Sequence, residues 1–461
     1  MMSEYDIFLI TAPSPNPGTL FAYEQISTPP LGLGYLATFL KSDNYLVKII
    51  DMALRRNNME TILRFLENNS SRIVGISCTT ETYNTAIRIS SEIKSIYKDS
   101  IIILGGPHVS FEFEAALKND SVDYIILNEG EISLKKLCDY LIRNIGALET
   151  LKGVAYKKNG IVICAEPEPF IKNLDLLPFP DRTLFEHIHD YKNPATLSTS
   201  RGCPGQCIFC AASVLSGGRY RMRSVQSVIS EVEYLKFLGF HHIDFVDDTM
   251  TVSISRLNSF LDELISRNLK ITWTCESRVD SMSKDILLKM KVAGLKGIQF
   301  GVESGNQDIL DSIKKNITLK QVQDAFKWCN ELSIYVYSNL IIGQPFDTIK
   351  TIEETIQLAE ELMQLGAFVT ISVCTPFPGT PIWNNTEIYG IEITESNLDY
   401  YNTHNPVLNT KHLSATEIGN IQYKVVKQLD KLKKRIKKDS AISADVQGIR
   451  IRNPLESSLE K

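Results

Sequence analysis

The sequence predicts an α/β protein in two parts, each built from strands and helices that alternate along the chain. Short runs rich in β-branched residues alternate with helix-length segments five times before residue 145 and six times after residue 195. A segment containing Pro178 and Pro180 separates the two series. Because such alternation is typical of parallel sheets covered by helices, we expect a doubly wound sheet in the first part and a barrel-like sheet in the second.

Composition and charge are those of an ordinary globular protein. Of the 461 residues, 43% are apolar and 22% are charged, and the net charge of -5 provides no field that favours nucleic acid or an anionic membrane. The first residues lack the pattern of a signal peptide, and no apolar run approaches the length that spans a bilayer. Six of the nine cysteines are scattered singly, as is usual in a reducing compartment. We therefore expect a cytoplasmic protein with no membrane span and no nucleic-acid partner.

The first part, residues 1–145, contains five runs that are typical of buried parallel strands. These strands are expected over 7–12, 46–52, 73–77, 101–105 and 124–127, with helices over 32–42, 59–68, 83–97, 111–119 and 132–143. Ligands of such sheets bind outside the carboxyl ends of the strands, which are followed here by loops 11–15, 78–81, 105–108 and 128–131. Glycine in these loops lets the backbone approach a ligand, and threonine and glutamate supply hydrogen-bonding groups. These features fit a nucleotide or any other ligand of this sheet class.

The alternation stops over residues 146–194, which we expect to form a linker with a hairpin. Strand-like residues 154–156 and 161–163 flank Asn159-Gly160, a dipeptide typical of a tight hairpin turn. The proline-containing segment 174–182 then disfavours a helix. We place the domain boundary here.

The second part, residues 195–385, predicts an open, partial (β/α)6 barrel. Its strands are expected over 195–199, 242–246, 271–275, 298–302, 336–342 and 368–374, and its helices over 225–237, 256–266, 284–292, 319–331 and 352–365. Residues 386–461 are expected to form a helical region and a tail. One or two amphipathic helices over 414–438 carry many lysines, which we interpret as a solvated face.

Three cysteines follow the first strand of this second part. Cys203, Cys207 and Cys210 are spaced Cys-x3-Cys-x2-Cys. Four thiolates would close the coordination shell of a zinc ion, whereas three thiolates on a cubane cluster leave one iron open to a small ligand. A zinc knuckle or three unrelated core cysteines are the alternatives.

The cysteine spacing, with Phe209 just before the last cysteine, resembles the signature of the radical S-adenosylmethionine (SAM) superfamily. The resemblance continues through the strand ends that follow, including Gly301-Val302-Glu303-Ser304-Gly305. It implies that the three cysteines hold a 4Fe-4S cluster whose open iron chelates SAM, and that an electron from the cluster cleaves SAM to a 5′-deoxyadenosyl radical. The SAM-binding residues that it implies are Phe209, Asp247, Asp248, Arg278, Glu303, Ser304, Gly343 and Thr375. Asp247 and Asp248 cannot be separated here, because Asp248 could instead cap the next helix.

Placed directly before such a core, the first part resembles the cobalamin-binding domain found in many members of that superfamily. Gly105-Gly106-Pro107-His108 and Glu129-Gly130-Glu131 carry the resemblance. The cobalamin contacts that it implies are Thr11, Thr79, Thr80, Gly105, Gly106, Glu129 and Gly130. The sequence has no Asp-x-His-x-x-Gly motif, so the lower cobalt ligand is unassigned.

The resemblance implies a cobalamin-dependent radical SAM methyltransferase that acts on an unactivated carbon, or on phosphorus, of a small-molecule or natural-product intermediate. A reductant such as flavodoxin or ferredoxin is implied as the electron source. One alternative keeps the cofactors but performs a cyclisation or rearrangement, and another is a non-catalytic cobalamin-binding module. A methylthiotransferase ranks last, because those enzymes usually carry an additional three-cysteine domain. The identity of the substrate stays open.

Overall fold

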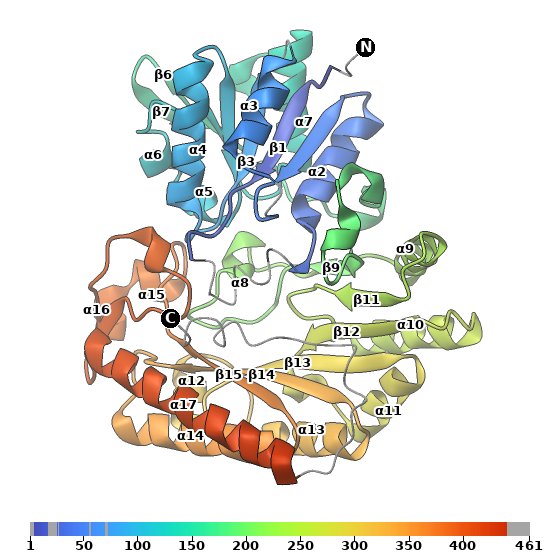
Figure 1. Cartoon of the computed structure of the whole chain (residues 1–461), viewed down its shortest axis with the longest axis vertical. Coiled ribbons are helices and arrows are strands. Elements are labelled where there is room, and N and C mark those ends of the chain that lie inside the picture. The colour runs from blue at the N-terminus through green and yellow to red at the C-terminus, as the bar shows by residue number, and fades with distance from the viewer. Residues whose placement is uncertain (1–3, 17–24, 26, 55–56, 70–71, 440–461) are drawn as a thin grey trace. The chain divides into compact units, whose positions relative to one another are not determined.

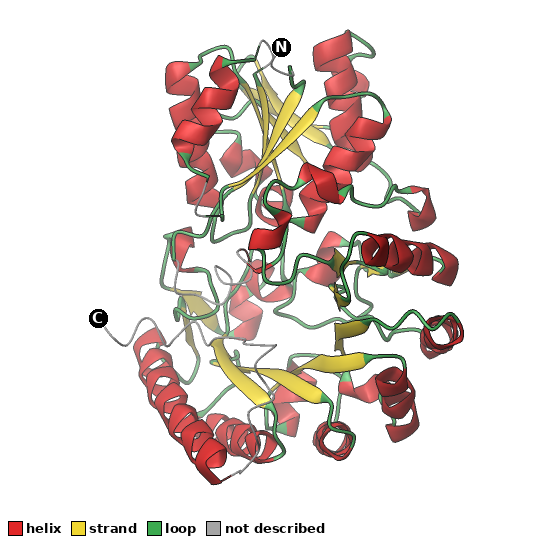
Figure 2. Cartoon of the chain, turned by 45° about the vertical axis from the view of Figure 1, so that its right-hand side comes forward, coloured by secondary structure: helices red, strands yellow, loops and turns green. Residues whose placement is uncertain are grey.

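The computed structural model describes residues 4–16, 25, 27–54, 57–69 and 72–439. The chain divides into two compact units, Met1–Thr196 and Leu197–Lys461, which are blue to green and green to red in Figure 1. Each unit contains one main sheet that is flanked by helices (Figure 2). The predicted tail after residue 439 lies outside the described residues.

The sheet of unit 1 is doubly wound, as predicted. Its strand order is β2-β1-β3-β4-β5-β6-β7, and the first five strands pair in parallel. The strands are β1 (Ile7–Thr11), β2 (Val47–Asp51), β3 (Ile73–Ser77), β4 (Ile101–Gly105), β5 (Tyr124–Ile126), β6 (Val154–Lys158) and β7 (Ile161–Cys164). The helices are α2 (Leu31–Ser42), α3 (Met59–Glu67), α4 (Tyr83–Ile96), α5 (Pro107–Phe111), α6 (Phe113–Ala116) and α7 (Gly130–Arg143).

Both faces of the parallel part of this sheet are buried, which explains the continuous apolar runs in its strands. Phe8 and Ile10 of β1 belong to one hydrophobic cluster, whereas Ile7 and Leu9 belong to the cluster on the opposite face. The strand order reverses between β1 and β3. This switch point places the loops after those two strands beside each other, where doubly wound sheets bind ligands.

The segment expected to be a linker packs onto unit 1. Its hairpin, β6 and β7, extends the sheet antiparallel to β5, and both Asn159 and Gly160 have the positive φ values of the tight turn. Farther along, Phe185 is buried in a core cluster, and the Tyr191 hydroxyl donates to Asp51 Oδ2 at 2.6 Å. Proline excludes a regular helix here but does not prevent apolar side chains from packing.

Unit 2 contains the predicted partial (β/α)6 barrel. Its sheet has the order β15-β14-β13-β12-β11-β8, and β11 to β15 pair in parallel. The strands are β8 (Thr196–Leu197), β11 (His242–Phe245), β12 (Thr272–Ser277), β13 (Leu295–Glu303), β14 (Tyr335–Ile342) and β15 (Phe368–Val373). The helices between them are α8 (Ala212–Leu215), α9 (Val225–Phe237), α10 (Ile254–Ser266), α11 (Lys284–Val292), α12 (Gln307–Ser312), α13 (Leu319–Glu331) and α14 (Ile349–Gln364).

Hydroxyl side chains cap the first turns of most of the long barrel helices. Ser224, Ser253, Ser283, Thr318 and Thr348 each accept a hydrogen bond from a backbone N–H in the first turn of α9, α10, α11, α13 and α14. Asp248, which the sequence left as a possible cap, is not the residue that caps α10. Asp248 therefore does not have the role of a helix cap.

Short elements complete unit 2. They are β9 (Ser200–Arg201), which pairs with β10 (Arg221–Met222), and α15 (Pro381–Asn384), α16 (Thr386–Tyr389), β16 (Ile391–Ile393) and β17 (Leu408–Thr410). A single long helix, α17 (Ala415–Asp439), packs against the edge strand β15 and against α14 (Figure 1).

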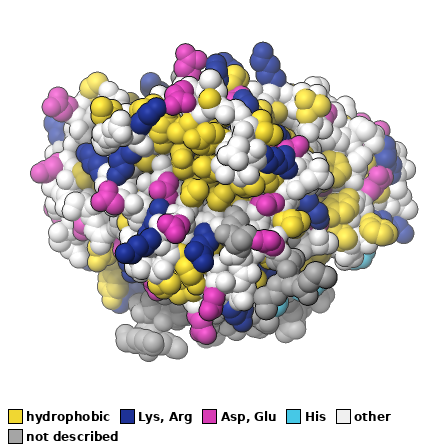
Figure 3. Space-filling model, turned by 90° about the horizontal axis from the view of Figure 1, so that it is seen from above, with side chains coloured by type: hydrophobic (Ala, Val, Ile, Leu, Met, Phe, Trp, Pro, Cys, Tyr) yellow, Lys and Arg dark blue, Asp and Glu magenta, His cyan; other side chains and the backbone are white. Residues whose placement is uncertain are grey.

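The surface agrees with the balanced composition. On the face drawn in Figure 3, lysine and arginine are interspersed with aspartate and glutamate around a group of hydrophobic side chains. Among the described residues, no helix has both the length and the apolar character needed to cross a membrane.

Candidate functional site

The three cysteines lie in one loop of unit 2, between β9 and α8. Cys203, Cys207 and Cys210 are free thiols that are partly exposed. A Cβ atom added at Gly205 would lie 3.3 Å from Cys203 Sγ and 3.9 Å from Cys207 Sγ, so both sulfurs border the same small space. The Gly205 N–H donates to Cys203 Sγ at 3.4 Å. The loop therefore brings two of its three thiols to one space, with a glycine between them.

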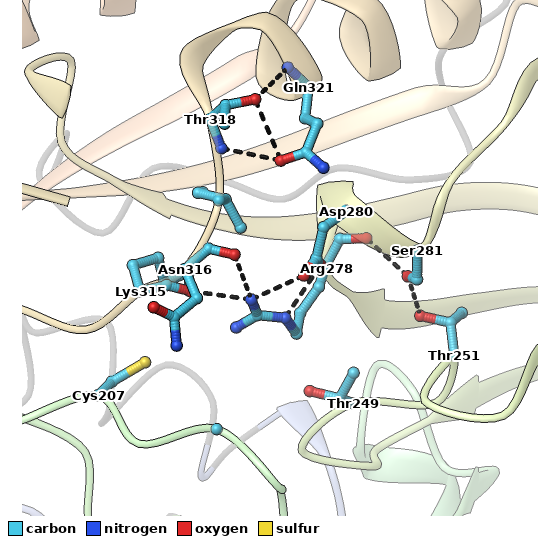
Figure 4. Close-up of polar contacts among 12 residues, drawn as sticks. Cys207, Thr249, Thr251, Arg278, Asp280, Ser281, Lys315, Asn316, Thr318 and Gln321 are labelled. Atoms are coloured by element: carbon cyan, nitrogen blue, oxygen red, sulfur yellow. Dashed lines mark hydrogen bonds and ion pairs between the residues drawn. The ribbon is translucent and has the colours of Figure 1, made fainter. Parts of the chain in front are cut away.

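Two basic side chains border this loop. Arg278 follows β12, and its Nη1 lies 3.9 Å from the same added Cβ position at Gly205. Its guanidinium is held by Asp280 through two hydrogen bonds of 3.0 and 2.9 Å, and it also donates to the backbone carbonyl of Lys315 at 2.8 Å (Figure 4). Arg278 is thus fixed in place by its own loop before any ligand binds.

Lys315 is the second basic residue, and it pairs with Glu303 at the end of β13. Its Nζ lies 2.7 Å from Glu303 Oε1, and both side chains are buried. The pair needs the glycine at position 301, since a Cβ there would lie 2.5 Å from Glu303 Oε1 and 2.9 Å from Lys315 Nζ. Glu303 itself has a φ of 73°, next to an irregularity in the pairing of β13 with β14. A non-glycine residue in this region is strained, and such strain clusters at functional sites.

Burial and the neighbouring basic side chains act on the pKa of Cys207 in opposite directions. Burial raises the pKa of Cys207, while Lys315 and Arg278 act to lower it. Burial likewise raises the pKa of Cys210 to about 11. Burial lowers the pKa of Lys315, but the Glu303 carboxylate and the Cys207 thiol outweigh it and the net shift is upward. Lys315 is therefore a cation at neutral pH and supplies positive charge beside the cysteine loop.

Asp247 and Asp248 have different surroundings, although they are neighbours after β11. The Asp247 carboxylate is buried and accepts from the Thr199 N–H at 3.0 Å and from the Thr199 and Ser200 hydroxyls. Asp248 is exposed, and its carboxylate accepts from the Gly202 N–H. Burial raises the pKa of the Asp247 carboxyl. The protein surrounding the Asp248 carboxyl also raises its pKa by limiting solvation, although part of the residue reaches solvent. Asp247 thus holds the chain that leads into the cysteine loop, and Asp248 is the one with room for a ligand.

The remaining residues that the sequence singled out in unit 2 lie at successive strand ends. Ser304 is buried and shares a hydrogen bond of 3.2 Å with Thr355 of α14, and Thr375 donates to the Val373 carbonyl at 3.4 Å. Gly343 follows β14 with a φ of 73°, and Phe209 is half-buried in the cysteine loop. Of these, Ser304 and Thr375 use their hydroxyls within the protein.

In unit 1, the loops after β1, β3, β4 and β5 meet at the carboxyl edge of the sheet. The Cys78 N–H, which directly follows β3, donates to the Gly105 carbonyl at 3.0 Å. Gly106 has a φ of 106°, and a Cβ there would lie 2.4 Å from the Cys78 carbonyl oxygen. Only glycine allows this close approach of two loops.

Side chains on this edge are largely held by one another. Thr79 N–H donates to the Thr82 hydroxyl at 2.9 Å, Thr80 shares a hydrogen bond of 3.2 Å with His108 Nδ1, and Glu129 Oε2 accepts from the Ile171 N–H at 3.1 Å. Burial lowers the pKa of His108 to about 4, so its imidazole is neutral at pH 7. Gly130 begins α7, where an added Cβ would lie 3.1 Å from Leu36 Cδ2.

Thr11, at the end of β1, differs from these hydrogen-bonded side chains. Its hydroxyl is buried and has no hydrogen-bond partner among the described residues. An unpaired hydroxyl beside the switch point is the kind of group that a bound ligand satisfies. Together with the backbone at Gly105 and Gly106, it fits a polar ligand such as the corrin of cobalamin.

The donor set of the loop fits an iron-sulfur cluster. Each thiolate of a cubane cluster binds a different iron, and three thiolates leave the fourth iron open. The loop, with Arg278 and Lys315 beside it, supplies three thiolates together with compensating positive charge.

Several residues of this site carried no recognisable signal in the sequence. Lys314 and Lys315 are consecutive lysines shortly after a helix, and lysines in such a position usually face solvent. Thr249 lies 3.7 Å from Cys203 Sγ, and Thr251 links to Arg278 through Ser281 (Figure 4). These contacts join residues that are far apart along the chain, so only the folded structure reveals them.

Two family models match the chain. The radical SAM superfamily model covers residues 197–359, and the B12-binding domain model covers residues 25–137. The first match therefore contains the cysteine loop, and the second contains the loops after β3, β4 and β5.

Relatives and solved structures agree with both matches. An uncharacterized methyltransferase of Pyrococcus horikoshii is 34% identical over 85% of this chain and 86% of its own length. The anaerobic magnesium-protoporphyrin IX monomethyl ester cyclase of Rubrivivax gelatinosus is 26% identical over 85% of this chain and 71% of its own. The radical SAM methyltransferase TsrM of Kitasatospora setae, solved with cobalamin and a 4Fe-4S cluster, shares the fold with a TM-score of 0.72 at 17% identity, over 93% of this chain and 91% of that one.

Proposed function

The chain belongs to the radical SAM enzymes that carry a B12-binding domain, and from this premise we propose that it methylates an unactivated carbon or a phosphorus atom of a small molecule. When bound, the cluster supplies the electron that cleaves SAM, and cobalamin carries the methyl group. The observation that supports the proposal most is the cysteine loop of unit 2, whose thiols lie beside the fixed cations Arg278 and Lys315.

The residues of unit 2 would have separate binding roles. Cys203, Cys207 and Cys210 would hold the cluster, and the Asp248 carboxylate would accept hydrogen bonds from the amino group or ribose of SAM. Arg278 and Lys315 place positive charge near the thiolates. This charge would compensate the negative charge of the cluster and of a bound carboxylate. Phe209, Glu303, Ser304, Gly343 and Thr375 form the rest of the proposed SAM site.

The residues of unit 1 would hold the second cofactor. The buried Thr11 hydroxyl and the backbone at Gly105 and Gly106 would contact cobalamin, and Thr79, Thr80, Glu129 and Gly130 would shape the edge around it. The neutral His108 imidazole is hydrogen-bonded to Thr80 and packs against the Tyr83 ring, with ring centroids 4.4 Å apart and the ring planes tilted by 43°. We therefore assign His108 to shaping the edge.

The decisive experiment is anaerobic purification and reconstitution with iron, sulfide and hydroxocobalamin, followed by metal analysis and a visible spectrum. We expect roughly four irons per chain, together with stoichiometric cobalt. SAM labelled with deuterium in its methyl group should then pass the label to an acceptor. Iron without cobalt would contradict the methyl-transfer proposal.

A second candidate function is a cyclisation or rearrangement that uses the same cofactors. It is supported by the similarity to the magnesium-protoporphyrin ester cyclase over 85% of this chain. The two candidates differ in the fate of the labelled methyl group. Under cyclisation the label would stay in SAM and methionine, while 5′-deoxyadenosine still forms.

A further inference from the structure

A threonine hydroxyl contacts one of the three thiols of the cysteine loop. The Thr249 Oγ1 atom lies 3.7 Å from Cys203 Sγ, within hydrogen-bonding distance for sulfur, and Thr249 is only 3% exposed. The same hydroxyl also donates to the backbone carbonyl of Asp248. Because a hydroxyl has a single proton, Thr249 can direct that proton to the carbonyl or to the sulfur.

The loop after β11 holds this hydroxyl in place. The Thr249 carbonyl accepts from the Tyr220 hydroxyl at 3.3 Å. The preceding carboxylate, Asp248, accepts from the N–H of Gly202, which is the residue before Cys203. Two consecutive residues of the β11 loop thus contact two consecutive residues of the cysteine loop. This alignment keeps the Thr249 hydroxyl beside the Cys203 sulfur.

The direction of the hydrogen bond between Thr249 and Cys203 depends on what the sulfur carries. In the free thiol, the Cys203 S–H can donate to Thr249 Oγ1 while the Thr249 proton goes to the Asp248 carbonyl. A cysteine sulfur bound to iron has no proton and can only accept. The Thr249 hydroxyl can then donate to the sulfur by rotating about its C–O bond.

Cys203 and Cys207 differ in the groups that face their sulfurs. The Gly205 N–H donates to Cys203 Sγ at 3.4 Å, in addition to the contact with Thr249. Cys207 Sγ lies 3.8 Å from the backbone carbonyl oxygen of Lys314, which can only accept. Hydrogen bonds to the sulfurs are among the features that set the reduction potential of an iron-sulfur cluster. The Thr249 side chain is therefore placed to act on that potential.

We propose that the Thr249 hydroxyl donates a hydrogen bond to the Cys203 sulfur when the cluster is bound, and that this bond raises the reduction potential of the cluster. Reduction adds one electron from an external reductant and increases the negative charge on the thiolates, and a hydrogen-bond donor stabilises the more negative state more strongly. The inference rests on the proposed function, because it takes the three thiolates as cluster ligands. It gives Thr249 a role in electron entry that is separate from SAM binding.

Three variants isolate the hydroxyl. T249V removes it and keeps the shape of the side chain, whereas T249S keeps the hydroxyl. T38V is the matched control in unit 1, since Thr38 is 9% exposed and its hydroxyl donates to the Gly34 carbonyl at 2.8 Å. All three variants change a buried threonine, but only T249V removes a donor to a thiolate of the cysteine loop.

The experiment uses the full-length chain reconstituted with iron and sulfide, without SAM. Ti(III) citrate supplies the electron, and the reduced cluster is followed by electron paramagnetic resonance as the solution potential is varied. T249V should bind as much iron as wild type, while its equilibrium constant for reduction should fall by about tenfold, which is about 59 mV for a one-electron couple. T249S and T38V should keep the wild-type midpoint potential.

Two results would overturn the inference. One is a T249V midpoint potential equal to that of wild type, and the other is a T249S variant whose potential falls as far as that of T249V. T249A is titrated in parallel, in case valine prevents cluster assembly. If iron analysis shows that the wild-type chain takes up no cluster, the proposed function itself fails, and this outcome is known before any titration.

Discussion

The Lys315 ammonium lies 2.7 Å from the Glu303 carboxylate, with the two side chains only 9% and 8% exposed. The pair spans from the end of β13 to the segment after α12, and the Cys207 thiol is close enough to Lys315 to be affected by its charge. A buried ion pair depends on both partners, because removing one leaves the other charge unpaired in a poorly solvated place.

Replacing Lys315 by methionine should destabilise unit 2 by about 3–5 kcal/mol, the usual cost of breaking a buried pair. Urea denaturation of the cofactor-free chain measures the effect. Lys320 is the matched control, since its Nζ lies 2.7 Å from Asp324 Oδ1 but its side chain is 77% exposed. K320M should leave the midpoint unchanged, and the double variant E303Q/K315M should recover part of the loss. A K315M variant as stable as wild type would show that the pair contributes nothing.

Changing Cys207 to alanine should remove most of the cluster iron and abolish SAM cleavage, because the cluster then lacks one of its three protein ligands. Cobalamin binding by unit 1 should persist. Iron analysis and 5′-deoxyadenosine formation measure the two effects, with C164A, a change to an exposed cysteine of β7, as the control. Full SAM cleavage by C207A would refute the assignment of this thiol.

The two neighbouring aspartates should respond in opposite ways to the same change. D247N should lower stability by about 1–3 kcal/mol, because its carboxylate accepts from Thr199 and Ser200 in a buried place. D248N should leave stability nearly unchanged and weaken SAM binding. Thermal melts and equilibrium dialysis separate the two, and equal effects on SAM binding would contradict the distinction.

Asp51 should make stability depend on pH in the acid range. Burial raises the pKa of this carboxyl from 3.8 to about 6, against the opposing hydrogen bond from Tyr191. The folded state therefore binds the proton more tightly than the unfolded state. Protonated Asp51 contributes on the order of 3 kcal/mol to the free energy of unfolding below about pH 4, and this contribution is lost as the pH rises to 6. D51N should flatten the pH dependence relative to wild type, whereas Y191F should extend it to higher pH. Identical pH profiles for D51N and wild type would exclude this role.

Replacing Gly106 by alanine should disrupt the carboxyl edge of the first sheet. The new Cβ would lie 2.4 Å from the Cys78 carbonyl, at a φ that alanine rarely adopts. Cobalamin binding should fall while the iron content of unit 2 is retained. G32A is the control, because nothing lies within 4 Å of its added Cβ. Unchanged cobalt uptake by G106A would separate this loop from the cofactor.

Much of the fold was predictable because its signals are local. The apolar runs of the parallel strands and the Asn159-Gly160 turn are each determined by residues that are neighbours in the sequence. The predicted strands agree with the observed ones to within a few residues. The first barrel strand is shorter than expected, since Thr199 turns its N–H to Asp247 instead of extending β8.

The site was less predictable, because its contacts join distant segments. The cysteine spacing is visible in the sequence, but the Glu303–Lys315 pair depends on an irregularity in β13 and on the space left at Gly301. Asp247 and Asp248 look alike in sequence, and only burial separates them.

The strained backbone at Glu303 is held in place by the ion pair that its side chain makes. A left-handed conformation costs a non-glycine residue about 1–3 kcal/mol, and glycine would avoid that cost. The same replacement would remove the carboxylate and leave the buried Lys315 ammonium without its partner, at a cost of about 3–5 kcal/mol. Because the second cost is larger, glycine at this position would lower stability, and the fold itself retains glutamate there whether or not the site is used.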